Sequence, residues 1–264
     1  MKMTKLFNSI IVGPIHSRRL GSSLGINLLP QFGKVCNFDC IYCECGWNKD
    51  GRQDTKLPTV EQVKAALEAR LKEIQAEGVP VDSITYSGNG EPTLHPQFAE
   101  IVDITVELRN KYCPGAVISL LSNATGVWKP KIREALKKID NPILKIDSPI
   151  ESCFRHINNP ALGISLEKIK ESLADLKGQF ILQTMFLRGV VENGKERFEI
   201  DCTAPEHVAS WQNLVRELGP KKVMMYTIDR DTPAKALSKV SFEEMKKIAQ
   251  PLVDEGFNIN IAGQ

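Results

Sequence analysis

Residues 34–47 read KVCNFDCIYCECGW, in which Cys36, Cys40 and Cys43 have C-x-x-x-C-x-x-C spacing and Tyr42 precedes the third cysteine. Three thiolates in one short loop can bind a single metal centre. A structural zinc site takes four ligands, usually as two separated pairs. Cys45 could supply a fourth thiolate, but no second C-x-x-C pair follows downstream. A [4Fe–4S] cluster held by three cysteines keeps one iron open to a small molecule, so this loop predicts a metal site that takes part in chemistry.

On either side of this loop the chain predicts strands that alternate with helices. A first strand at residues 22–29 precedes the loop, and six helix–strand units follow it. The predicted helices are 59–77, 96–112, 130–139, 165–176, 205–218 and 242–255, and the predicted strands are 83–87, 117–121, 143–147, 180–187, 223–228 and 257–261. Such alternation implies parallel strands joined by right-handed crossovers. An incomplete barrel and a doubly wound open sheet both fit, and each places its site at the C-terminal ends of the strands.

Length and composition indicate one globular α/β domain over residues 1–264, with residues 1–23 as an irregular lead-in. Hydrophobic residues make up 42% and charged residues 25% of the 264 residues, and the net charge of +2 is too small to indicate nucleic-acid binding. No apolar run has the length of a membrane span, and the N-terminus lacks the pattern of a signal peptide. We therefore expect no membrane association and a cytoplasmic location. In that compartment the seven cysteines indicate metal binding more than disulfides.

A second motif, YSGNGEP at residues 86–92, follows a predicted strand and precedes a predicted helix. Gly88 and Gly90 would let a ligand approach the backbone closely, and Glu91 offers a carboxylate to a cationic group. An ordinary strand-to-helix turn is the alternative. Polar residues also end the next two strands, namely Ser122 and Asn123, then Asp147 and Ser148. Each of these could equally cap a helix or fix a turn.

The cysteine spacing, with Tyr42 before Cys43 in a loop after a first strand, resembles the signature of the radical S-adenosylmethionine (radical SAM) superfamily. The resemblance implies a partial (β/α)6 TIM-like barrel of parallel strands, with a [4Fe–4S] cluster at their C-terminal ends. Cys36, Cys40 and Cys43 would hold the cluster, Tyr42 would pack beside the cofactor, and Cys45 would be a bystander.

The resemblance extends to the cofactor S-adenosylmethionine, which would chelate the fourth iron. Gly88, Gly90 and Glu91 would bind its ammonium group, and Ser122, Asn123, Asp147 and Ser148 would reach its ribose and carboxylate. An electron from a donor such as flavodoxin or ferredoxin would generate a 5′-deoxyadenosyl radical, which abstracts hydrogen from a substrate. No catalytic residue beyond the cluster ligands is assigned.

The segments GPIHSRRLGSSLGINLLP, CNFDCIYCECG, YSGNGEPTLHP and YTIDRDTPAKAL are similar to a bacterial and archaeal group of radical SAM proteins linked to wyosine-type tRNA modification. This similarity makes a tRNA nucleoside one candidate for the substrate, which the sequence itself does not identify. The wyosine synthases bind a second cluster through cysteines upstream of the main motif, and residues 1–35 contain no cysteine. Two alternatives stay open: an activating enzyme that installs a glycyl radical on a partner protein, and a non-catalytic metal-binding module.

Overall fold

The computed structural model describes residues 6–17, 19–51, 54–193 and 196–262, and these form two compact units. The N-terminal unit contains Lys5–Asn37 and Asn48–Ile143, and the C-terminal unit contains Phe38–Trp47 and Leu144–Gln264. The cysteine loop is therefore divided, because Cys36 belongs to the N-terminal unit, whereas Cys40, Cys43 and Cys45 belong to the C-terminal unit. Strand β5 (Asn141–Lys145) carries the chain from one unit into the other.

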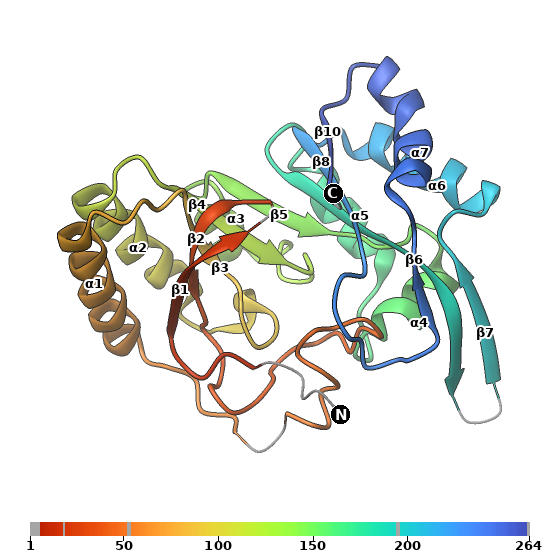
Figure 1. Ribbon diagram of the computed structural model, residues 1–264. Helices are drawn as coiled ribbons and strands as arrows, with labels where there is room; N and C mark the ends of the chain where they lie inside the picture. The colour runs from red at the N-terminus through yellow and green to blue at the C-terminus, as the bar shows by residue number, and fades with distance from the viewer. Residues whose placement is uncertain (1–5, 18, 52–53, 194–195, 263–264) are drawn as a thin grey trace. The chain divides into compact units, whose positions relative to one another are not determined.

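The N-terminal unit alternates strands with helices in the predicted order. Its strands pair in the order β1-β2-β3-β4, antiparallel between β1 and β2 and parallel thereafter. Figure 1 shows helices α1 and α2 side by side in this unit. The elements are β1 (Ile11–Ser17), β2 (Gly21–Ile26), α1 (Val60–Glu77), β3 (Ser83–Tyr86), the 3-10 helix η1 (Pro92–Leu94), α2 (Phe98–Tyr112), β4 (Val117–Ser122) and α3 (Pro130–Leu136).

The C-terminal unit pairs its parallel strands in the order β6-β8-β10. Strands β7 and β9 pair antiparallel with the distal part of β6, and β6 and β7 form the long hairpin in Figure 1. The elements are α4 (Glu151–Asn158), α5 (Leu166–Ala174), β6 (Ile181–Asn193), β7 (Glu196–Asp201), α6 (Pro205–Leu218), β8 (Lys222–Thr227), β9 (Leu237–Lys239), α7 (Phe242–Asp254) and β10 (Ile259–Ile261).

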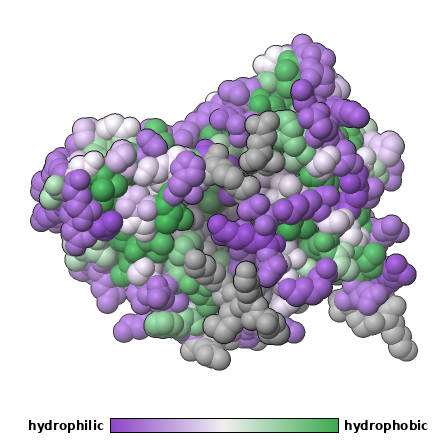
Figure 2. All heavy atoms as spheres, in the orientation of Figure 1, coloured by the Kyte–Doolittle hydropathy of each residue, from purple (hydrophilic) through white to green (hydrophobic). Residues whose placement is uncertain are grey.

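Helix α1 shows how local sequence determines these elements. Its valines, leucines and Ile74 recur every three or four positions and are all buried, whereas Figure 2 shows mainly hydrophilic residues at the outer edge where α1 lies. Thr59 and Gln62 form the predicted capping box, and Gly78 ends the helix in the left-handed conformation that a glycine adopts without strain. The second predicted capping box, Ser241 with Glu244, begins α7. The buried face of α1 consists of Val60, Val63, Leu67, Leu71 and Ile74.

The predicted α/β class with mostly parallel strands is confirmed, but the prediction of an irregular lead-in over residues 1–23 is wrong for β1. Pro14 within β1 lacks an N–H donor, yet the strand forms because β1 is at the end of the strand order, where it pairs with β2, and because its register shifts between Val12 and Ile15. Such an irregularity accommodates a proline in a strand. Helix α4 and strands β7 and β9 are also absent from the sequence-based prediction. None of the helices in the described part of the chain combines the length and apolarity that a membrane crossing requires.

Candidate functional site

In the C-terminal unit, the cysteine loop docks on the C-terminal end of helix α4. The last carbonyls of a helix have no partner within the helix. Here the loop supplies donors, since the N–H of Asp39 lies 2.9 Å from the carbonyl oxygen of Asn158 and the N–H of Ile41 lies 3.0 Å from that of Ile157. Asn159 then ends α4 in the left-handed conformation. The backbone on both sides of Cys40, at Asp39 and at Ile41, is thereby fixed by hydrogen bonds to a helix end.

An aromatic contact reinforces this docking. The rings of Phe38 and Phe154 meet edge to face with centroids 5.5 Å apart, and both side chains are buried. Such pairs contribute about 0.5–1.5 kcal/mol beyond the area that they bury. The first residue of the loop in this unit is therefore fixed by packing as well as by backbone hydrogen bonds.

Cys40, one of the three predicted cluster ligands, is buried and receives two nitrogen donors. Asn158 Nδ2 lies 3.4 Å from its Sγ, and Lys145 Nζ lies 4.0 Å from it. Burial raises the pKa of the Cys40 thiol, whereas the Lys145 charge and the Asn158 hydrogen bond oppose that rise. Both donors favour the thiolate, the form that binds a metal.

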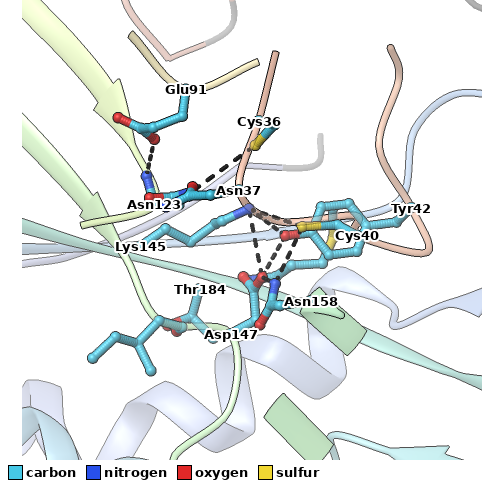
Figure 3. Close-up of polar contacts among 12 residues, drawn as sticks. Cys36, Asn37, Cys40, Tyr42, Glu91, Asn123, Lys145, Asp147, Asn158 and Thr184 are labelled. Carbon is cyan, nitrogen blue, oxygen red and sulfur yellow. Dashed lines mark hydrogen bonds and ion pairs between the residues drawn. The ribbon is translucent and has the colours of Figure 1, made fainter. Parts of the chain in front are cut away.

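Asp147, at the end of the segment that begins with β5, organises the donors around Cys40. Its side chain is fully buried, and it accepts hydrogen bonds from the Tyr42 hydroxyl, from Asn158 Nδ2 at 2.6 Å and from the Met185 N–H at 3.0 Å. Lys145 Nζ lies 3.6 Å from the same carboxylate. We call Tyr42, Lys145, Asp147 and Asn158 the Asp147 cluster, which Figure 3 shows pointing toward one another. A buried carboxylate is tolerated only when it is paired and hydrogen-bonded, as this one is.

The buried environment shifts the other two titratable groups of the Asp147 cluster. Burial raises the pKa of Tyr42, and the Asp147 carboxylate raises it further. Burial alone would lower the pKa of Lys145, but the negative charges of Asp147 and Cys40 outweigh it and raise that pKa. Tyr42 is thus a neutral donor and Lys145 a cation, and Lys145 Nζ lies 2.5 Å from the Tyr42 hydroxyl oxygen.

The other cysteines of the loop are partly exposed. The Cys43 N–H donates to the Cys40 carbonyl at 3.1 Å in a tight turn, and Cys45 follows it in the same unit. Cys36, in the N-terminal unit, lies 3.9 Å from Asn123 Nδ2. Among the residues that the structure describes, no group of three or more His, Cys, Asp or Glu side chains is gathered closely enough to hold a metal ion. The ligand roles of Cys36, Cys40 and Cys43 therefore stay a prediction from their spacing.

In the N-terminal unit, the buried Glu91 joins the turn after β3 to the end of β4. Its Oε1 accepts from the Thr93 N–H at 3.0 Å, from the Thr93 hydroxyl at 2.6 Å and from the Ser122 hydroxyl at 2.8 Å. Its Oε2 accepts from the Asn123 N–H at 2.7 Å. The structure thus gathers three of the predicted site residues, Glu91, Ser122 and Asn123, which with Thr93 we call the Glu91 cluster.

The two predicted glycines of the 86–92 motif lie against the protein itself. A Cβ at Gly90 would lie 1.9 Å from the Val35 carbonyl oxygen, and one at Gly88 would lie 2.2 Å from Asn27 Oδ1. Gly90 also has φ 136°, which other residues adopt only with strain. Val35 accepts from the Glu91 N–H at 3.0 Å, so the segment that leads into Cys36 is bonded to this turn.

Ser148 has partners that the sequence does not reveal. Its hydroxyl oxygen lies 3.0 Å from Nε2 of the buried His207 on α6, and it accepts from the Ile150 N–H at 3.1 Å. Burial lowers the pKa of His207. Ser148 therefore connects the turn after β5 to α6.

Sequence reasoning missed Lys145, Asn158 and His207. Lys145 and Asp147 are two positions apart on an extended segment, so they share a face, which is a usable signal. Asn158 is reached only through α4, a helix of eight residues. Phe154 and Ile157, spaced three apart and both buried, together with the Glu151–Arg155 ion pair, are the periodic signals for that helix.

The comparisons with known proteins agree with this arrangement. The Radical SAM superfamily model matches residues 31–200, which is more than half of the chain. A UPF0026 protein of Methanocaldococcus jannaschii is 30% identical over 91% of this chain and 70% of its own length.

Two solved structures have a similar fold. A radical SAM methyltransferase from Sphaerobacter thermophilus aligns with a TM-score of 0.65 at 14% identity, over 90% of this chain and 65% of that chain. Native anSMEcpe with bound AdoMet and Cp18Cys peptide aligns with a TM-score of 0.59 at 18% identity, over 90% of this chain and 62% of that chain. This chain therefore spans slightly less than two thirds of either solved chain.

The family match covers the cysteine loop, the Glu91 cluster and the Asp147 cluster together. Members of this family use a [4Fe–4S] cluster with S-adenosylmethionine, as the resemblance of the cysteine motif implies. The chain belongs to the Radical SAM superfamily of enzymes.

Proposed function

We propose that this enzyme cleaves S-adenosylmethionine reductively at a [4Fe–4S] cluster held by Cys36, Cys40 and Cys43. The observation that carries the proposal is the fixed position of Cys40 and Tyr42, whose side chains are buried against Asp147, Asn158 and Lys145. A loop without a function would have no need for a buried carboxylate and a largely buried ammonium group beside Cys40.

The donor set fits an iron–sulfur cluster. Cys40 accepts a hydrogen bond from an amide and lies beside an ammonium group, and Cys36 lies near the Asn123 amide. Each sulfur thus has a nitrogen donor that favours its thiolate form, and at Cys40 these donors oppose the rise in pKa that burial causes. When bound, the reduced cluster supplies one electron to the sulfonium of S-adenosylmethionine, which gives methionine and a 5′-deoxyadenosyl radical. That radical would abstract hydrogen from the substrate.

We propose that Glu91 binds the ammonium group of S-adenosylmethionine. Its Oε2 accepts one hydrogen bond from the described residues, and a carboxylate oxygen has about two acceptor positions. Since Oε1 accepts three hydrogen bonds, Oε2 is the less occupied oxygen and is the one that we propose for the ammonium donor. Gly88 and Gly90 shape this turn, and Ser122 and Asn123 orient the carboxylate. We also propose that Asp147 and Ser148, which follow β5, reach the ribose and carboxylate of S-adenosylmethionine.

The first experiment tests the chemistry. Protein purified without oxygen should contain iron and sulfide and, after reduction, convert S-adenosylmethionine to methionine and 5′-deoxyadenosine. Cys36→Ala, Cys40→Ala and Cys43→Ala should each abolish this cleavage, whereas the matched control Cys45→Ala should retain it. A colourless protein that holds one zinc ion, as a non-catalytic metal-binding module would, contradicts the proposal, as does full cleavage by all three variants.

For the substrate, we propose a tRNA nucleoside, from the similarity to the wyosine-linked group. The alternative is a partner protein that receives a glycyl radical. Incubation with deuterated tRNA, or with a deuterated candidate protein that copurifies, should transfer deuterium into 5′-deoxyadenosine from the true substrate only. A one-electron donor such as flavodoxin or ferredoxin should replace the chemical reductant in the same assay.

A further inference from the structure

The sulfur of Cys40 lies beside two nitrogen donors that share one carboxylate. We propose that Asp147 positions the Asn158 amide and the Lys145 ammonium against Cys40 Sγ, and that these donors raise the reduction potential of the [4Fe–4S] cluster. The inference rests on the proposed function, because it requires that Cys40 be a cluster ligand.

The orientation of the Asn158 amide is determined by its two acceptors. A primary amide nitrogen carries two N–H donors, and Asn158 Nδ2 lies 2.6 Å from Asp147 Oδ2 and 3.4 Å from Cys40 Sγ. The side chain is 1% exposed, and its Oδ1 has no hydrogen-bond partner among the described residues. Rotating the amide by half a turn would place that oxygen against a carboxylate and a thiolate. The observed orientation, with both N–H groups on anions, is therefore the favourable one.

Lys145 places a positive charge near the same sulfur. Its Nζ lies 4.0 Å from Cys40 Sγ and 3.6 Å from Asp147, and its side chain is 16% exposed. The Tyr42 hydroxyl, which donates to Asp147, lies 2.5 Å from the same nitrogen. Asp147 thus holds the ammonium group near Cys40 by charge, and the negative charge of its carboxylate partly offsets the effect of the ammonium on the sulfur.

The consequence for the cluster follows from charge. Reduction adds one electron from the external donor, so the reduced cluster and its thiolate ligands are more negative than the oxidised ones. Hydrogen bonds to ligand sulfur and nearby positive charge stabilise the more negative state, which raises the reduction potential. Asn158 and Lys145 would therefore make the cluster easier to reduce, with Asp147 as the positioning residue.

The test is a redox titration of the full chain, reconstituted without oxygen and followed by electron paramagnetic resonance of the reduced cluster. Asn158→Leu keeps the approximate volume and removes both N–H donors. We expect its ratio of reduced to oxidised cluster to fall about tenfold at a fixed potential, which is a shift of ~59 mV for a one-electron couple. An unchanged potential would overturn the inference.

Thr184→Val is the matched control for a purely structural effect. The Thr184 hydroxyl donates to the Ile146 carbonyl at 2.8 Å and accepts from Trp211 Nε1 at 3.0 Å, so the variant loses buried hydrogen bonds beside Asp147 without touching a cysteine. It should unfold more easily yet keep the wild-type potential. If Thr184→Val shifts the potential as far as Asn158→Leu does, the effect is structural and the inference is wrong.

Lys145 provides a second, independent variant should Asn158→Leu fail to fold. Lys145→Met should lower the potential, and Lys145→Arg, which keeps the charge, should restore most of the loss. Equal potentials in the Met and Arg variants would contradict the inference. Absence of any iron–sulfur cluster from the wild-type protein would overturn the proposed function as well, whereas a normal cluster with an unresponsive potential would overturn only this inference.

Discussion

The Asn123 N–H donates to Glu91 Oε2 at 2.7 Å, so a buried carboxylate joins the end of β4 to the turn after β3. These two strands are paired in parallel from Ser83 to Tyr86. The pairing ends at Tyr86 and Leu120, and beyond it the Glu91 side chain accepts hydrogen bonds from Ser122 and Asn123. The carboxylate that we propose for the cofactor ammonium is therefore also part of the protein's own structure.

Glu91→Gln should affect both stability and cofactor binding. The amide would direct an NH₂ group at one of the donors that now bind the carboxylate, and leaving a buried donor unpaired costs about 1–3 kcal/mol. The loss of the negative charge should also weaken S-adenosylmethionine binding about tenfold or more. Urea denaturation and equilibrium dialysis measure the two effects. Glu100→Gln, on the exposed surface of α2, is the control and should change neither.

Phe154→Leu should loosen the cysteine loop. The substitution removes the edge-to-face contact with Phe38 and should cost about 1 kcal/mol of folding free energy. Iron content per chain after reconstitution should fall, because the loop loses its packing on α4. Phe186→Leu is the control, since Phe186 is equally buried and forms a similar pair with Trp211. It should lose similar stability and retain iron, and equal iron loss in both variants would contradict the prediction.

Glu244 should stabilise the fold at pH values above about 4.5 and lose this effect as the pH falls toward 2. Its hydrogen bond with Arg188, followed by those with Ser241, lowers the pKa of Glu244 to about 2 from 4.5. A depressed carboxyl pKa contributes stability that is present above 4.5 and is lost as pH falls toward 2. The stability difference between wild type and Glu244→Gln should therefore shrink over that interval in urea denaturation.

Glu243→Gln is the matched control for that effect, because Glu243 occupies the same first turn of α7. Its difference from wild type should be smaller, because the capping box and the ion pair with Arg188 both involve Glu244. A Glu244→Gln difference that stays constant down to the lowest pH would show that the ion pair with Arg188 does not stabilise the fold.

His207 should make the fold sensitive to mild acid. Burial lowers its pKa below 6.5, so the unfolded chain binds a proton more readily than the folded chain does. Stability should therefore be fully present above about pH 6.5 and decline as pH falls through the folded pKa. His207→Gln should flatten this decline in urea denaturation, whereas His16→Gln, at an exposed position, should not. A wild-type stability that is constant over this range would contradict the assignment.

The helices and parallel strands could be predicted because their signals are local. The apolar spacing of α1 and the capping boxes at Thr59 and Ser241 lie within a few residues of each other, and the structure confirms them. Strand β1 was missed because Gly13 and Pro14 interrupt it, and its existence depends on pairing with β2. Strands β7 and β9 likewise form by pairing with the distal part of β6.

The candidate site likewise has one part that local sequence predicts and one part that depends on residues far apart in the chain. The spacing of Cys36, Cys40 and Cys43 is a local pattern, and the family follows from it. The surroundings of Cys40 are not local, since Lys145 and Asn158 lie 105 and 118 residues later in the chain. No short window contains such pairs, so only the folded chain reveals them.

That separation has a consequence for how the enzyme is made. A ribosome adds about 5–20 residues per second, so the partners of Cys40 emerge roughly 5–24 s after it. Until then the thiols of a nascent chain have no folded surroundings, and a chain that stops before α4 never acquires them. Iron delivered to the loop during synthesis would meet an unstructured peptide, whereas iron delivered after release would meet Cys40 in its folded surroundings. Maturation of the metal centre should therefore be a late event in the life of each chain.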